Sequence, residues 1–221
     1  MVLKAKSCSP DIFFRSFTLF FALLLTWVWL SQAAPVRAAV PEPKETVAAA
    51  VDKIIGILTD PELATPQNRE KRYRLVVATV EEFFDFAEIS MRTLGPRWRE
   101  LDDGERRRFI ELFKQFLQKN YIDRVDSYSG EEVVVKDQEI REDRRGNRFA
   151  MVNTDFVMKS QTVPVNYRLL YRGGNWLVYD VDIEGVSLVR NFRSQFEPYS
   201  FAELIRRMEK SIATGKDLEE Q

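Results

Sequence analysis

Hydrophobic and polar side chains alternate along the second half of the chain, from Tyr128 to Ile183. A period of two places successive side chains on opposite faces of a strand, so that one face can be buried. The alternation predicts four strands, over residues 131–142, 148–159, 163–172 and 175–183. Short polar links join them, and two of these links contain Gly beside Asn, as hairpin turns do. The strands should therefore form an antiparallel meander.

The first half of the chain carries apolar side chains at three- and four-residue spacing, which is typical of a helix with one buried face. These stripes predict helices over about residues 47–58, 73–87 and 102–121, and a final helix around 201–208. Pro61 should end the first helix, and Asp102 or Asp103 should cap the third. Residues 86–98, which contain Gly95-Pro96, are predicted to be a connector.

A strand, a sharp turn and an amphipathic helix follow one another around Gly185. Before it, alternate residues from Leu177 to Ile183 are apolar, which predicts one buried strand face. After it, one helix face is predicted from the spacing of Val186, Val189, Phe192 and Phe196. Gly185 supplies backbone freedom for the turn, and Ser187 is the predicted N-cap. This corner is expected to close a core.

Together these elements predict an α+β fold. Helices from the first half should pack on one face of the four-stranded meander, and the helix that follows Gly185 should close one end. A chain of 221 residues suits one substantial domain. The sequence has no internal repeat and no Gly-rich phosphate loop.

The composition excludes several kinds of chemistry. The chain has no histidine, which removes the usual general base and the usual zinc ligand. Its one cysteine, Cys8, lies near the N-terminus, so disulfides and Cys-based metal sites are not expected in the mature protein. With 33 basic and 34 acidic side chains, the total gives no sign of a nucleic-acid partner. No cofactor and no metal are expected.

The N-terminus has the layout of a secretory signal peptide. Lys4, Lys6 and Arg15 precede an apolar run over residues 17–30, and small residues follow. The run is short for a spanning helix, which takes roughly 20 apolar residues, although an uncleaved anchor stays an alternative. Cleavage is expected after Ala38 or Ala33. The predicted organisation is therefore a signal peptide over 1–38, one domain over 39–215 and a disordered acidic tail over 216–221.

Three sets of acidic residues could suggest chemistry. Glu81-Glu82 is interpreted as part of a solvated helix face, because adjacent helical residues point apart. Asp102-Asp103 is interpreted as a helix cap, since no calcium-binding loop follows. Asp155, Asp180 and Asp182 lie on predicted strands, where a buried carboxyl group could act as an acid, as in small isomerases and dehydratases of this fold class.

Large apolar residues are abundant on both helices and strands, and the chain has 16 phenylalanines. They could fill an ordinary core, or they could line an elongated cavity between the helices and the sheet. The same residue types line both, so composition leaves the two alternatives open.

Several motifs resemble those of the MlaC family, also called toluene-tolerance auxiliary proteins. The most specific is Glu184-Gly185-Val186-Ser187-Leu188-Val189, which follows the block Tyr179-Asp180-Val181. The others are Thr93-Leu94-Gly95 with Trp98, the series Phe109, Phe113, Phe116, Tyr121 and Tyr128, and Gly174-Asn175-Trp176. The resemblance covers roughly residues 43–213.

The resemblance implies a cystatin-like sheet, similar also to that of nuclear-transport-factor-like domains, with helices that enclose a deep apolar pocket for acyl chains. It implies a monomeric periplasmic phospholipid carrier that moves lipid between an outer-membrane lipoprotein–porin complex and an inner-membrane ABC transporter, and so maintains outer-membrane lipid asymmetry. Alternatives are a binding protein for a small hydrophobic solute and a small pocket isomerase or hydratase.

For the carrier, we expect the pocket lining to come from both layers. The predicted lining residues from the helices are Phe84, Ile89, Leu94, Trp98, Phe113, Phe116, Leu117 and Tyr121; those from the sheet and the corner are Tyr167, Leu169, Trp176, Val178, Val186 and Val189. Arg97, Arg99 and Asn191 are candidates to lie near a phosphate group or a partner protein.

Overall fold

The computed structural model describes residues 41–126, 128–215 and 218. The expected signal peptide therefore lies outside the described residues, as does the expected acidic tail apart from Leu218. Within the described part of the chain, no helix is long and apolar enough to cross a membrane.

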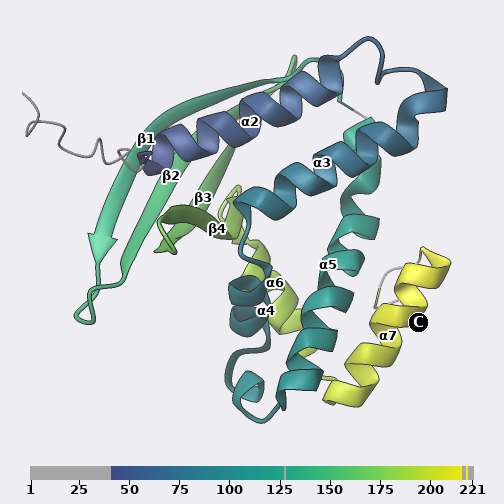
Figure 1. Ribbon diagram of the computed structural model, residues 1–221, viewed down its shortest axis with the longest axis vertical. Coiled ribbons are helices and arrows are strands. Elements are labelled where there is room, and N and C mark those ends of the chain that lie inside the picture. The colour runs from purple at the N-terminus through teal and green to yellow at the C-terminus, as the bar shows by residue number, and fades with distance from the viewer. Residues whose placement is uncertain (1–40, 127, 216–217, 219–221) are drawn as a thin grey trace, which may run out of the picture. The chain divides into compact units, whose positions relative to one another are not determined.

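Six α-helices and two short 3₁₀ segments are described, and the strands of the sheet lie between α5 and α6 in the chain (Figure 1). They are α2 (Pro43–Thr59), α3 (Arg69–Phe83), α4 (Phe86–Leu94), α5 (Asp103–Asp126), α6 (Leu188–Phe196) and α7 (Phe201–Thr214), with η1 (Pro66–Asn68) and η2 (Gly95–Arg99). The cap at α5 is confirmed, because Oδ1 of Asp102 accepts from the N–H of Glu105 at 2.8 Å. Glu105 Oε2 in turn accepts from the N–H of Asp102 at 3.0 Å, which completes a capping box.

The predicted connector over 86–98 is wrong, since these residues form α4 and η2. The chain leaves α3 at Phe84, which is extended and bridges to Val178 of the sheet. Asp85 then caps α4 by accepting from the N–H of Glu88 at 2.8 Å. The buried face of α4 includes Glu88, Ser90 and Thr93, and these polar residues conceal its helical periodicity in the sequence.

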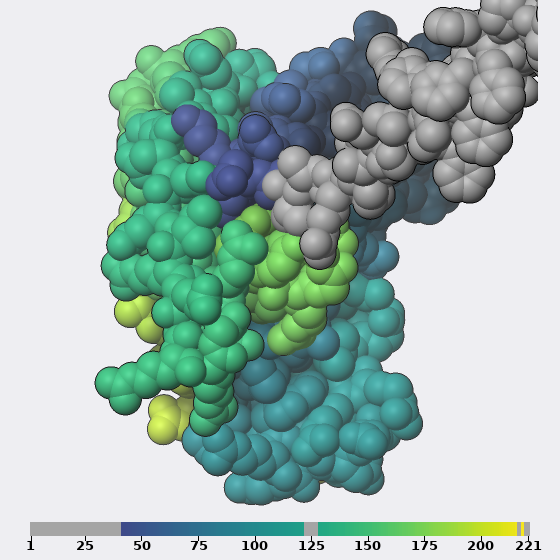
Figure 2. Space-filling model, turned by 60° about the vertical axis from the view of Figure 1, so that its left-hand side comes forward, coloured from purple at the N-terminus to yellow at the C-terminus, as the bar shows by residue number. Residues whose placement is uncertain are grey.

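In the described residues the sheet has five strands, in the order β1-β2-β3-β4-β5 with antiparallel neighbours. The strands are β1 (Glu132–Glu142), β2 (Arg148–Val157), β3 (Thr162–Arg172), β4 (Asn175–Ile183) and β5 (Val186–Ser187). The four predicted strands are confirmed, and the predicted strand number of four is corrected to five. The turn between β1 and β2 is exposed and projects from the surface (Figure 2).

The fifth strand arises at the corner around Gly185. Glu184 and Gly185 both have positive φ, at 53° and 86°, so the chain reverses tightly and Ser187 pairs with Asp182. Val186 is therefore a strand residue that is 60% exposed, and its predicted place on the helix face is wrong. The predicted N-cap is confirmed, because Ser187 Oγ accepts from the N–H of Arg190 at 3.1 Å.

A bulge in β4 changes which of its side chains face the core of the sheet. Arg168 pairs with Asp180 while its neighbour Leu169 pairs with Val178, so Tyr179 is an extra residue. Val178 and Val181 consequently lie in the same core, although their spacing is three. The predicted buried face of Leu177, Tyr179, Val181 and Ile183 is wrong. The buried residues of β4 are Trp176, Val178, Asp180 and Asp182, and Ile183 is exposed.

Among the residues that the structure describes, two clusters of buried apolar side chains are found. The helical core unites α4, α5, α6 and α7 around packed phenylalanine rings, with Phe113 5.4 Å from both Phe192 and Phe196. The sheet core contains Val47 of α2 with Val152, Leu169, Trp176 and other residues of the strands. Phe84 packs against both clusters. Leu218 is buried in the helical core, with 3% of its surface exposed. At this residue the structure differs from the expectation of a disordered tail.

Candidate functional site

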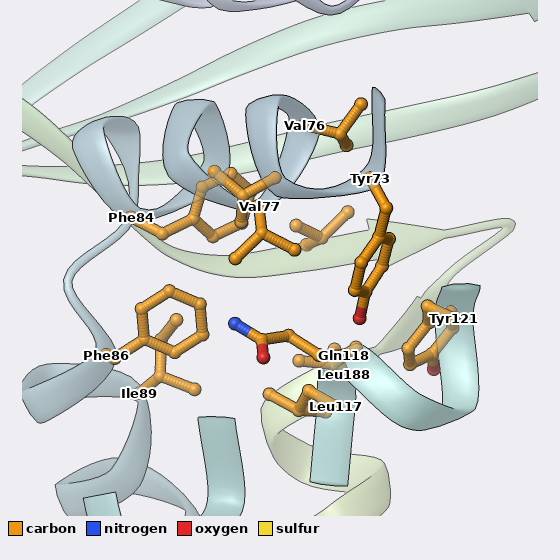
Figure 3. A pocket seen from close by; sticks show the side chains of 12 residues that line it. Tyr73, Val76, Val77, Phe84, Phe86, Ile89, Leu117, Gln118, Tyr121 and Leu188 are labelled. Atoms are coloured by element: carbon orange, nitrogen blue, oxygen red, sulfur yellow. The ribbon is translucent and has the colours of Figure 1, made fainter. Parts of the chain in front are cut away.

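An apolar cavity of about 260 Å³ lies between the two cores. Figure 3 shows it beneath α3, with Phe84 and Phe86 at one end and Tyr73 and Tyr121 at the other. Its lining residues are Tyr73, Val76, Val77, Val80, Phe84, Phe86, Ile89, Leu117, Gln118, Tyr121, Val181 and Leu188. No acidic or basic side chain is among these residues, so the cavity suits an uncharged apolar group.

The three-four spacing of α3 accounts for one wall. Tyr73, Val76, Val77 and Val80 occupy one face of this helix, and that face is turned toward the cavity. The face continues beyond the end of the helix to Phe84, which is held to β4 because the N–H of Asp85 donates to the carbonyl oxygen of Val178 at 2.9 Å. The end of the cavity is thus fixed by backbone pairing.

The helices α4 and α5 lie across the cavity from α3 (Figure 3), and the sheet and the corner add one lining residue each. Val181 reaches the cavity because the bulge at Tyr179 turns it to the same side as Val178. Leu188 reaches it as the first residue of α6. The start of α6 is held by Asp180, whose two carboxylate oxygens accept from Ser187 Oγ at 2.7 Å and from the N–H of Val189 at 3.0 Å.

An ion-pair network holds α4 to the end of β3. Arg172 donates to Asp85 at 2.6 Å and to Glu88 at 2.8 Å, and Arg92 also pairs with Glu88, at 2.7 Å. The carboxylate side chains are each less than a tenth exposed, so their charges need these partners. This network positions Phe86 and Ile89, which lie on the first turn of α4.

Polar atoms in the lining come from Tyr73, Gln118 and Tyr121. Burial, and to a smaller extent the charge of Glu70, raises the pKa of Tyr73, so its phenol group stays neutral at physiological pH. Tyr121 is 43% exposed and marks an open end of the cavity. This end can hold polar atoms beside an apolar interior.

Four of the predicted lining residues do line the cavity: Phe84, Ile89, Leu117 and Tyr121. The structure places most of the others in filled cores. Leu94, Phe113, Phe116 and Val189 belong to the helical core, with Trp98 packed against it; Leu169, Trp176 and Val178 belong to the sheet core, with Tyr167 packed against it. Val186 points away from both cores and is exposed.

Eight lining residues were not predicted: Tyr73, Val76, Val77, Val80, Phe86, Gln118, Val181 and Leu188. The α3 stripe was visible in the sequence as a buried face, but spacing does not distinguish a cavity wall from a core. The place of Val181 in the lining depends on the bulge in β4. Gln118 is polar, so a pattern of apolar residues does not include it.

The remaining candidates serve other purposes in the structure. Arg97 donates to the carbonyl oxygens of Tyr199 and Phe196, at 2.7 and 3.1 Å, and so satisfies acceptors at the end of α6. Arg99 and Asn191 are exposed, and neither lines the cavity. Of the three strand acids, Asp155 pairs with Lys136, and Asp182 lies 3.6 Å from Arg190. None of the three lines the cavity, which does not support an acid catalyst there.

The adjacent acids on α3 point apart, as expected. Glu82 pairs with Lys53 of α2, whereas Glu81 pairs with Lys114 of α5. They are therefore more than a solvated face, because each links α3 to a different helix.

The fold and the cavity define an α+β domain that encloses an apolar site between a meander sheet and a helical layer. The chain belongs to the MlaC family, whose model matches residues 48–210. Among solved structures, it is similar to a phospholipid-binding protein from Ralstonia solanacearum, determined in complex with a phospholipid, with a TM-score of 0.67. The two are 22% identical over 78% of this chain and 98% of that one, a likeness that establishes the fold. No curated protein matches the chain.

Proposed function

We propose that this protein is a periplasmic phospholipid carrier that binds acyl chains in the cavity beneath α3. The observation that carries the proposal is the apolar cavity between the two cores, in a chain of the MlaC family. The phospholipid seen in the Ralstonia solanacearum protein supports the same ligand class. The carrier would move lipid between an outer-membrane lipoprotein–porin complex and an inner-membrane ABC transporter, and so maintain lipid asymmetry.

The energetics of lipid in water explain why such a carrier is needed. Two acyl chains of about 16 carbons carry roughly 30 methylene groups, and burial of each contributes about 0.8 kcal/mol. The gross gain, roughly 24 kcal/mol, exceeds the practical limit of about 18–21 kcal/mol for non-covalent binding. Tails that are exposed to water lose this free energy, so a lipid does not cross an aqueous space freely. The protein must therefore conceal the tails while the polar head stays near the surface.

The cavity must enlarge to hold a whole lipid. Its volume of about 260 Å³ is slightly below the range of about 300–1,000 Å³ typical of sites for small molecules. Because the walls come from separate helices and one strand, separation of α3 from α5 would widen it without unfolding either core. The structure then corresponds to a nearly closed form of the carrier.

The small volume also favours a second candidate, a binding protein for a small hydrophobic solute. One experiment separates the two functions. Protein purified from the cell envelope is examined by native mass spectrometry, and its extract is analysed for lipids. A carrier should contain a diacyl phospholipid. Protein that never contains a diacyl lipid, but binds an aromatic solvent, would support the second candidate and contradict the first.

The same purified protein tests export. Cleavage of the expected signal peptide predicts a mature chain that begins at Ala39 or Ala34, which its intact mass reveals. A mass that includes the apolar run over residues 17–30 would instead support the uncleaved anchor.

A further inference from the structure

A surface groove adjoins the cavity at the C-terminal end of α3. Its volume is about 460 Å³, and its lining residues are Glu81, Glu82, Phe84, Asp85, Phe86, Ile110, Lys114 and Leu177. The groove and the cavity share Phe84 and Phe86, whose stacked rings have centroids 6.3 Å apart. These two side chains therefore form a wall between the cavity and a space that opens to solvent.

A polar bridge crosses the seam between α3 and α5 beside this wall. Oε1 of Glu81 lies 3.1 Å from Nζ of Lys114 and accepts from Nε2 of Gln118 at 3.4 Å. Lys114 lines the groove, whereas Gln118 lines the cavity. The bridge thus extends from the groove to the cavity, across the contact between α3 and α5 that would break if the two helices separated.

The bridge is ionic under physiological conditions. Burial lowers the pKa of Lys114, but its bonds to Glu111 and Glu81 outweigh burial and raise the pKa overall. The ammonium group consequently stays charged. Its side chain is 22% exposed and that of Glu81 is 41% exposed, so water can solvate both groups when they separate. Ion pairs with this exposure are weak and are screened by salt.

The ion pair of Glu82, the residue next to Glu81, joins α3 to a different part of the molecule. Glu82 pairs with Lys53 of α2, and the residues that follow α3 pair with β4. These contacts hold α3 to α2 and to the sheet, whereas the bridge of Glu81 holds α3 to the helical layer. Separation at the seam would therefore break the bridge of Glu81 and leave the pair of Glu82 intact.

We propose that lipid enters and leaves through the seam between α3 and α5, and that the Glu81–Lys114 pair is a clasp that keeps this portal closed. When the pair opens, Glu81 passes into water while Lys114 keeps its pair with Glu111 of the same helix, at 3.0 Å. The rings of Phe84 and Phe86 can then turn aside to join the cavity to the groove. An acyl chain then passes between these rings into the apolar cavity. This inference rests on the proposed function and names the path that the lipid takes.

A cross-link across the seam tests the path. The parent is the exported protein with Cys8, its one native cysteine, replaced by serine. Glu81→Cys with Lys114→Cys is joined by a short bismaleimide, and Lys53→Cys with Glu82→Cys is the matched control that joins α3 to α2. Transfer of a fluorescent phosphatidylcholine from each protein to phosphatidylcholine vesicles is then measured.

The seam-linked protein should keep its lipid and transfer it at least tenfold more slowly, while the control transfers at the rate of the parent. Equal rates for the seam-linked protein and the parent would overturn the portal. A parent that carries no phospholipid would instead contradict the proposed function, so the two failures are distinguishable.

A second experiment tests the clasp without a cross-link. Glu81→Gln removes its charge and should raise the transfer rate about two- to fivefold, as expected for the loss of a weak, partly exposed ion pair. Glu82→Gln is the control and should leave the rate unchanged. Added salt should accelerate the parent but not Glu81→Gln. The clasp is disproved if both substitutions have the same effect.

Discussion

The hydroxyl group of Ser187 donates a hydrogen bond of 2.7 Å to the carboxylate of Asp180, seven residues earlier in the chain. The same oxygen accepts from the N–H of Arg190 and so caps α6. One buried side chain therefore satisfies a buried carboxylate and begins the helix that presents Leu188 to the cavity. Asp180 acts here as a structural acceptor at the corner between β4 and α6.

Ser187→Ala should destabilise the protein by about 1–3 kcal/mol, because it removes the cap and leaves a buried carboxylate oxygen with one donor fewer. Ser200→Ala is the matched control, since Ser200 caps α7 on the surface through the N–H of Glu203 at 3.3 Å. Its cost should be no more than about 1 kcal/mol. Urea unfolding measures both, and equal costs would contradict a role of Ser187 beyond capping.

Val77→Trp should expel lipid without loss of the fold. Val77 points into the cavity from the middle of α3 (Figure 3), so an indole ring there occupies the space that we propose for an acyl chain. We expect the bound phospholipid to fall at least tenfold, with a stability change of less than about 1.5 kcal/mol. Lipid extraction and thermal unfolding provide the two measurements. Val186→Trp, on the exposed strand β5, should change neither quantity.

Phe113→Ala should show the opposite behaviour, because Phe113 is fully buried in the helical core and does not line the cavity. Its truncation should cost about 3–5 kcal/mol in the free energy of unfolding. Phe86→Ala, at the end of the cavity, should cost less because Phe86 is only partly buried, and it should alter lipid retention more. If Phe113→Ala released lipid while the fold kept its stability, the placement of Phe113 in a filled core would be wrong.

Arg172→Met should loosen α4 from the sheet. The substitution removes the partner of Asp85 and one of the two partners of Glu88, both of which are largely buried. Because Arg172 itself is half-exposed, we expect a destabilisation of about 1–3 kcal/mol, less than for a fully buried pair. Arg141→Met breaks the exposed pair with Glu139 and should cost almost nothing in the same unfolding experiment.

The local features of the fold could be predicted from the sequence. The four long strands begin and end within a few residues of the predicted limits, because alternation reports directly which side chains face a core. Asp102 and Ser187 were identified as caps for a similar reason: a cap depends on residues only three positions apart. Helix α4 was missed, since its buried face includes the polar residues Glu88, Ser90 and Thr93, and one of the two ion-pair partners of Glu88 is the distant Arg172 of β3.

The sequence alone therefore determined the α+β class, the antiparallel meander, the main helical faces and the lack of histidine chemistry. Only the tertiary structure decided that Val181 faces the cavity and Val186 faces solvent, because one extra residue at Tyr179 and a tight turn at Gly185 change the direction of the side chains. It also decided that Phe113 fills a core while Leu117, one helical turn away, lines a cavity. A cavity is the space that remains between packed layers, so its lining depends on distant contacts that a local pattern does not contain.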